Sequence, residues 1–240
     1  MRAVSLHRDV LVATSAVLQV NCVIVRGPVD EEGGGEGAGE TFLIDSPVLP
    51  DELATLPALL EQARFPALSG LLATHGDWDH LLGRLAFPGI PLGCAQSTAE
   101  RLRASPGEAQ RELRAFDKSL LIERPRPLAL GSVQALPVLG RCAVGDRELE
   151  LHPADGHTPD GMAIVIPWAR VLVAGDYLST VEPPELGKGS SVEAYLATLE
   201  RLRPLLASAE HIVPGHGPVL NAERALEVLE ENVALLTQAT

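Results

Sequence analysis

The chain has 240 residues, of which 46% are hydrophobic, so it can bury a large core as one domain or as two small ones. Its formal net charge of −13 argues against a nucleic-acid partner, because phosphate backbones are normally bound by clustered Lys and Arg. The arginines are scattered or alternate with Glu, as in residues 100–103, and we expect most of this charge on solvated helix faces.

The cysteines are too widely spaced to suggest a disulfide framework or a thiolate zinc cluster, since no Cys-x-x-Cys pair occurs. An apolar stretch over residues 10–25 is broken by polar side chains and has no evident cleavage site, so we do not interpret it as a signal peptide. No other apolar run approaches the roughly 20 residues of a membrane span. These features predict a cytoplasmic protein without a membrane anchor. The three cysteines are Cys22, Cys94 and Cys142.

Short runs of alternating apolar and polar residues open the chain. The runs at residues 3–6, 17–20 and 22–25 predict antiparallel strands. Residues 28–40 are rich in Gly and Glu and cannot bury apolar surface. We therefore predict a flexible surface loop there, followed by a strand at residues 41–45.

A helix is predicted over residues 50–63, where Leu53, Leu56 and Leu60 fall at helical spacing. A short apolar run at residues 68–73 predicts a strand, and a polar segment follows it directly. Strand, helix, strand and polar loop form an α/β unit, in which functional groups lie at the carboxyl end of the strand.

The second half of the chain repeats this pattern of strands followed by helices, which suggests two similar sheet-plus-helix halves packed face to face. No sequence repeat is detectable at the level of single residues. Strands are predicted at residues 133–137, 148–152, 162–166 and 171–174, and helices at residues 191–205 and 222–236.

Four side chains that can bind a metal follow the apolar run at residues 68–73, within six positions of one another: His75, Asp77, Asp79 and His80. A loop that leaves a strand can turn several side chains toward one point. Imidazole combined with carboxylate suits a divalent cation such as zinc, manganese or iron. The alternative interpretation is a solvated polar loop.

Three later segments each offer one further ligand at the junction of a strand and a loop. His157 lies in a Gly-rich turn, Asp176 follows an apolar strand, and His216 lies in a turn flanked by Gly and Pro. Taken singly, each residue fits an ordinary turn or helix cap. Their joint order along the chain favours a shared metal site.

In that order the chain resembles the metallo-β-lactamase superfamily, over about residues 10–219. The family's first motif is His-x-His-x-Asp-His, and here it is His75-x-Asp77-x-Asp79-His80. The resemblance implies an α/β fold of the four-layer αββα sandwich type, in a single domain over residues 1–240. It also implies a metal site at the edge between the two sheets.

By this resemblance, two divalent cations share the site. Asp176 would bridge them, and Asp45 would orient a ligand from behind. The ligands of one cation would be His75, Asp77 and His157, and those of the other Asp79, His80 and His216.

Asp77 is a departure from the family's pattern, because most members have histidine there. It adds a third carboxylate and makes the site more anionic. Zinc is the expected metal. Iron and manganese are the alternatives, since flavodiiron proteins of the same superfamily carry an acid at this position and bind iron.

The resemblance implies a metal-dependent hydrolase that activates a bridging water to cleave a small ester, thioester, lactone or amide. Asp79 would orient that water and transfer its proton. Two alternatives remain: a non-haem iron oxidoreductase of the persulfide dioxygenase or diiron type, and a binding protein with a degenerate site. The expected partner is a small-molecule substrate, with no nucleic acid and no membrane. The sequence indicates neither the substrate nor the oligomeric state.

Overall fold

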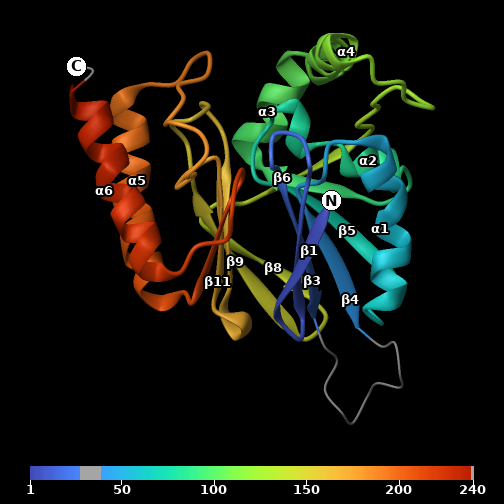
Figure 1. The fold of residues 1–240 in the computed structure, drawn as a ribbon, viewed down its shortest axis with the longest axis horizontal. Helices are drawn as coiled ribbons and strands as arrows, with labels where there is room; N and C mark the ends of the chain where they lie inside the picture. Colours follow the sequence, from blue (N-terminus) through green and yellow to red (C-terminus); the bar gives the residue numbers. More distant parts are fainter. Residues whose placement is uncertain (28–38, 239–240) are drawn as a thin grey trace.

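Two β-sheets lie face to face in the computed structural model, which describes residues 1–27 and 39–238 (Figure 1). The first sheet has seven strands in the order β1-β2-β3-β4-β5-β6-β7. Strands β1 to β4 pair antiparallel, and the pairs from β4 to β7 are parallel. The strands are β1 (Arg2–His7), β2 (Val10–Thr14), β3 (Asn21–Gly27), β4 (Glu40–Ile44), β5 (Leu68–Ala73), β6 (Leu92–Ala95) and β7 (Val133–Leu136).

The second sheet has five strands in the order β12-β11-β10-β9-β8. Its pairs are antiparallel except β11 with β12, which run parallel. As a result β9, β11 and β12 point the same way, and the loops that follow them emerge at one edge. The strands are β8 (Gly140–Val144), β9 (Arg147–Pro153), β10 (Met162–Ile166), β11 (Val171–Gly175) and β12 (His211–Pro214).

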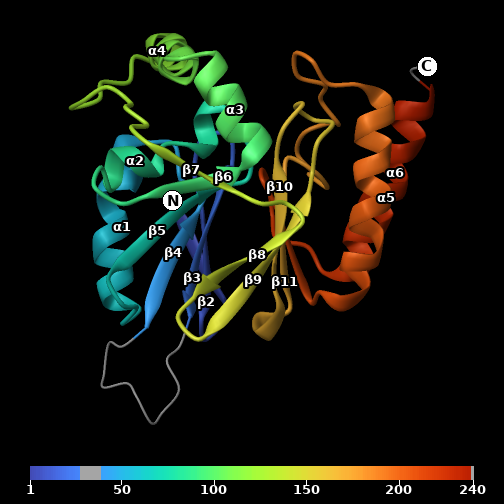
Figure 2. The ribbon, with the colours of Figure 1, turned by 180° about the vertical axis from the view of Figure 1, so that it is seen from behind.

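Helices cover the outer face of each sheet (Figure 2). Helices α5 and α6 pack on the second sheet, and the earlier helices lie on the side of the first. None of the described helices combines the length and apolar character needed to span a membrane. The helices are α1 (Pro50–Gln62), α2 (Gly83–Ala86), α3 (Gln96–Ala104), α4 (Glu108–Leu120), α5 (Val192–Ser208) and α6 (Ala222–Gln238), with short 3-10 turns η1 (Trp78–His80) and η2 (Pro167–Ala169).

Three hydrophobic layers hold these elements together. Because successive side chains of a strand point to opposite faces, Ile24 of β3 packs with Leu56 of α1, whereas Val23 packs between the sheets. In the second sheet, Leu172 of β11 packs with Leu199 of α5. Helix, sheet, sheet and helix therefore form the predicted four-layer αββα sandwich, which is confirmed.

The strand predicted at residues 17–20 is wrong. The second strand is β2, and residues 15–20 form a turn in which Leu18 and Gln19 adopt left-handed conformations with φ of 57° and 51°. The alternation of apolar and polar residues fits a strand as well as this turn, because the pattern carries no information about backbone handedness.

Helices α3 and α4 were not predicted, since their segments contain few apolar residues. Only Thr98 and Ala99 of α3, and Ala109 and Leu113 of α4, are buried. The loop predicted over residues 28–40 ends one residue earlier than predicted, because Glu40 already belongs to β4. Residues 28–38 of that loop lie outside the described part of the chain.

Candidate metal centre

The predicted ligands meet at the edge of the sandwich where parallel strands of both sheets end. The loop after β5 carries His75, and the loop after β9 carries His157. Asp176 directly follows β11, and His216 follows β12. Loops from the two sheets thus supply side chains to one point, as their order along the chain predicts.

The first group of side chains combines two histidines with two carboxylates. The Nε2 atoms of His75 and His157 lie 3.6 and 3.5 Å from Oδ2 of Asp77. Oδ2 of Asp176 lies 3.4 Å from the same nitrogen of His75 and 3.3 Å from that of His157. His75, His157 and Asp176 form a compact group that could hold a cation. Asp77 lies next to this group, with its Oδ2 facing both histidines.

The second group consists of Asp79, His80 and His216. Oδ2 of Asp79 lies 3.8 Å from Nε2 of His80 and 3.5 Å from Nε2 of His216. Asp176 reaches this group as well, with Oδ1 3.2 Å from Nε2 of His80 and Oδ2 3.4 Å from Nε2 of His216. Asp176 therefore touches histidines of both groups.

The spacing of these atoms fits ligands around a divalent cation. At a metal–nitrogen distance of about 2 Å, two ligands of a tetrahedral ion lie about 3.3 Å apart. Among the described residues, the buried Nε2 atoms of His75 and His80 and Oδ1 of Asp176 make no hydrogen bond of normal geometry, although Oδ1 lies 3.2 Å from Nε2 of His80. Buried polar atoms are rarely left without a partner, so their convergence on one point matches the donor set of a metal site.

Contacts on the far side of two histidines hold the rings in a ligating orientation. Nδ1 of His216 lies 2.8 Å from the carbonyl oxygen of Leu18, and Nδ1 of His157 lies 3.0 Å from that of Glu185. A carbonyl oxygen only accepts, so each Nδ1 must donate a proton, which leaves Nε2 free to bind a metal in the neutral ring. Sequence reasoning missed both acceptors, because a backbone carbonyl has no residue-type signature.

Asp45 lies behind His80, where the resemblance places a ligand-orienting group. Its Oδ2 is 3.0 Å from Nδ1 of His80. The carboxylate also accepts hydrogen bonds from the backbone N–H and the hydroxyl of Thr74, both at 2.8 Å. Asp45 thereby links the end of β4 to the end of β5 and to a candidate ligand.

The carboxylates raise the pKa values of the buried histidines. Burial lowers the pKa of His75, as does the charge of His80, but Asp176 and Asp77 together outweigh both and raise it to about 10. The same competition raises the pKa of His216 to about 9. In return, the pKa of the Asp176 carboxyl lies well below its usual range, since the charges of His80 and His75 outweigh its burial.

A small cavity of about 170 Å³ opens over the ligands. Trp78 forms part of its wall and also packs against Phe116 of α4, with ring centroids 4.6 Å apart and the ring planes tilted by 39°. Glu182 lies at the cavity with Oε1 3.5 Å from Nδ1 of His216, and burial raises the pKa of its carboxyl. The cavity thus joins the candidate metal centre to a polar, acidic wall.

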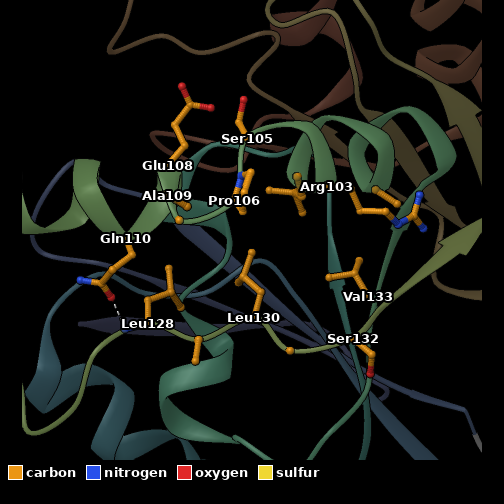
Figure 3. Close-up of a pocket in the computed structure, with 15 residues that line it drawn as sticks. Arg103, Ser105, Pro106, Glu108, Ala109, Gln110, Leu128, Leu130, Ser132 and Val133 are labelled. Atoms are coloured by element: carbon orange, nitrogen blue, oxygen red, sulfur yellow. Dashed lines mark hydrogen bonds between the residues drawn. The ribbon is translucent and has the colours of Figure 1, made fainter.

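A larger cavity of about 540 Å³ lies on the other side of α3, and none of the candidate ligands lines it. Pro106 and Ala109 face Leu128 and Leu130 across it (Figure 3). The smaller cavity, in contrast, is lined by the candidate ligands Asp77, Asp79, His157, Asp176 and His216.

The family model of the metallo-beta-lactamase superfamily matches residues 16–216, so the chain belongs to this superfamily. Proteins with this fold bind divalent metals, and the two groups of side chains described above are the corresponding candidate ligands. No curated protein matches the chain.

Solved structures share the fold at low sequence identity. The DIM-1 metallo-beta-lactamase aligns over 100% of this chain and 98% of its own, with a TM-score of 0.66 and 18% identity. A metallo-beta-lactamase family protein from Thermus thermophilus covers 98% of this chain and 81% of its own, with a TM-score of 0.71 and 21% identity. The metallo-beta-lactamase from Pontibacter korlensis has a TM-score of 0.65 and 17% identity, with 98% of both chains covered.

Proposed function

We propose that the protein is a hydrolase that holds two divalent cations, zinc in the first place, and cleaves a small ester, thioester, lactone or amide. The observation that carries this proposal is the position of Asp176, whose carboxylate contacts histidines of both ligand groups. A carboxylate between two sets of ligands is suited to bridge two cations. Cations held there would lower the pKa of a water toward about 7 and polarise the substrate's carbonyl oxygen.

The protein's own residues would bind and orient the reactants. His75, Asp77 and His157 would hold one cation, and Asp79, His80 and His216 the other. Asp79 also lines the cavity, so its carboxylate can accept a proton from a nucleophilic water and return it to the leaving group. The cavity of about 170 Å³ supports a small reacting group, since pockets for drug-sized ligands begin near roughly 300 Å³.

Metal analysis and activity assays test this proposal together. Purified protein should contain stoichiometric divalent metal and hydrolyse at least one member of a panel of small esters, thioesters, lactones and amides. His80→Ala and Asp176→Ala should each remove metal and activity. His211→Ala is the matched control, because His211 begins β12 at the end opposite His216 and should change neither. Absence of metal from the native protein, or activity that survives both substitutions, would overturn the proposal.

A second candidate function is redox chemistry at iron, and the specific observation that favours it is the set His75, His157 and Asp77. Oδ2 of Asp77 faces Nε2 of both histidines, which gives two imidazoles and one carboxylate, the ligand type of non-haem iron oxygenases. Metal-stripped protein should be reconstituted separately with zinc, manganese and iron. Oxygen uptake with iron and a persulfide, together with no hydrolysis by the zinc form, would favour this function over the first.

A further inference from the structure

Asp77 is held from its far side by an arginine that belongs to a different element. Nη2 of Arg101, in the second turn of α3, donates to Oδ1 of Asp77 at 2.7 Å. The other oxygen of the same carboxylate, Oδ2, faces the histidines His75 and His157. One oxygen is therefore engaged by the guanidinium, and the other is directed at the candidate metal centre.

Arg101 is itself fixed by a buried partner. Its Nη1 donates to Oδ1 of Asp160 at 2.8 Å, and the Asp160 side chain is only 1% exposed. Oδ2 of Asp160 in turn accepts the backbone N–H of Gly76 at 2.9 Å. The two terminal nitrogens of the guanidinium thus bind different loops: Nη1 binds Asp160 in the loop after β9, and Nη2 binds Asp77 in the loop after β5.

Gly76 packs directly against the Asp160 and Arg101 side chains. A Cβ at position 76 would make a tight contact of 3.2 Å with Oδ2 of Asp160 and would lie 3.4 Å from Nη1 of Arg101, at van der Waals distance. The glycine inside the segment His75-Gly76-Asp77 therefore packs against the Arg101–Asp160 pair. Three positions that look unrelated in the sequence form one contact.

Arg101 also compensates part of the negative charge that Asp77 adds to the candidate ligands. Arg101 brings one positive charge between Asp77 and Asp160, which offsets part of the repulsion that a carboxylate at position 77 adds beside Asp79 and Asp176. A paired guanidinium in a fixed fork also restricts the carboxylate's rotation.

We propose that Arg101, held by Asp160, is a positioning residue that makes Asp77 bind a cation through Oδ2 alone. Asp77 thereby acts as a ligand with one donor atom, as a histidine would at the same position. The inference rests on the proposed metal-binding function. It concerns the affinity and coordination number of the group His75, Asp77 and His157. Contacts of this kind behind a ligand typically change metal affinity by about 10- to 100-fold when removed.

The experiment titrates metal-stripped protein with Zn²⁺ in competition with a chromophoric chelator, and with Co²⁺ followed by its visible spectrum. Arg101→Ala should weaken binding of one of the two cations by about 10- to 100-fold. It should also shift the Co²⁺ spectrum toward higher coordination, because Oδ1 of Asp77 becomes free to bind. Arg101→Lys, which keeps the charge but loses the fork, should fall between Ala and the native protein. Arg103→Ala, an exposed position on the same helix, is the control and should bind as the native protein does.

A double-mutant cycle separates positioning from general support of the fold. In an Asp77→His background the ligand has a single donor atom by itself, so adding Arg101→Ala should change zinc affinity and the Co²⁺ spectrum very little. An equal loss in both backgrounds, or a single substitution Arg101→Ala that binds as the native protein does, would overturn the inference and leave the proposed function standing. Absence of metal binding by the native protein would overturn both.

Discussion

Nδ1 of His216 lies 2.8 Å from the carbonyl oxygen of Leu18, although the two residues are 198 positions apart in the sequence. Leu18 belongs to the turn between β2 and β3 of the first sheet. The carbonyl points at the imidazole because Leu18 has a left-handed backbone conformation, with φ of 57°. An exposed turn far away in the sequence thereby fixes which ring nitrogen of a candidate ligand stays free.

The backbone of Leu18, rather than its side chain, should matter for metal binding. Leu18→Pro cannot adopt a positive φ, so it should displace the carbonyl and weaken binding at the group containing His216 by about 10- to 100-fold. Leu18→Gly, which adopts positive φ freely, should bind metal like the native protein. Competition with a chelator measures both variants. Equal affinity of the two variants would contradict this role.

The approach of Asp176 to β12 should depend on a glycine. A Cβ at position 215 would collide with Oδ1 of Asp176, so Gly215→Ala should move that carboxylate and abolish binding of at least one cation. Gly89→Ala is the control, since a Cβ at position 89 meets nothing within 4 Å. The metal content of both variants is measured by mass spectrometry, and only Gly215→Ala should have lost metal. Full metal occupancy in Gly215→Ala would contradict the bridging position of Asp176.

Asp45 should act through His80. Asp45→Asn keeps the shape of the side chain but removes the charge 3.0 Å from Nδ1 of His80, so zinc affinity should fall by about 10- to 100-fold. Glu61→Gln on exposed surface of α1 removes the same charge elsewhere and should have no effect. Zinc titrations of both variants at the same pH provide the comparison. Unchanged affinity of Asp45→Asn would show that Asp45 only supports the fold.

The metal-free protein should lose stability as the pH rises from 7 to 10. Folding raises the pKa of His75 to about 10 and that of His216 to about 9, from 6.5 in the unfolded chain. The resulting stabilisation is complete below pH 6.5 and is lost as the pH passes through these folded-state values. Zinc must displace those protons, so its apparent affinity should rise over the same range.

Urea unfolding of chelator-treated protein at several pH values measures the first trend, and zinc titration measures the second. If the stability of the metal-free protein increases between pH 7 and 10, the stabilising role of protonated His75 and His216 is contradicted. A zinc affinity independent of pH would do the same.

The candidate ligands were predictable because metal binding depends on residue type and on order along the chain. The segment from His75 to His80 stands after a strand, and His157, Asp176 and His216 follow other strands. Hydrophobic periodicity likewise predicted α1, α5 and α6, whose buried faces recur every three or four residues.

Arg101 could not be found in the same way. The charged residues among positions 100–103 favour a solvated helix face, but the side chain of Arg101 is only 26% exposed and binds two aspartates. The partners Asp77 and Asp160 lie 24 and 59 positions away, so no local pattern connects them. Only the packing of α3 against two loops brings the three residues together.

The most direct test of a two-metal centre is a crystal of the zinc-loaded protein measured on both sides of the zinc absorption edge. Two anomalous peaks about 3.5–4 Å apart are expected, with the Asp176 carboxylate between them. One peak should lie among His75, Asp77 and His157, and the other among Asp79, His80 and His216. A single peak, or peaks that Asp176 does not touch, would contradict the proposed bridging carboxylate.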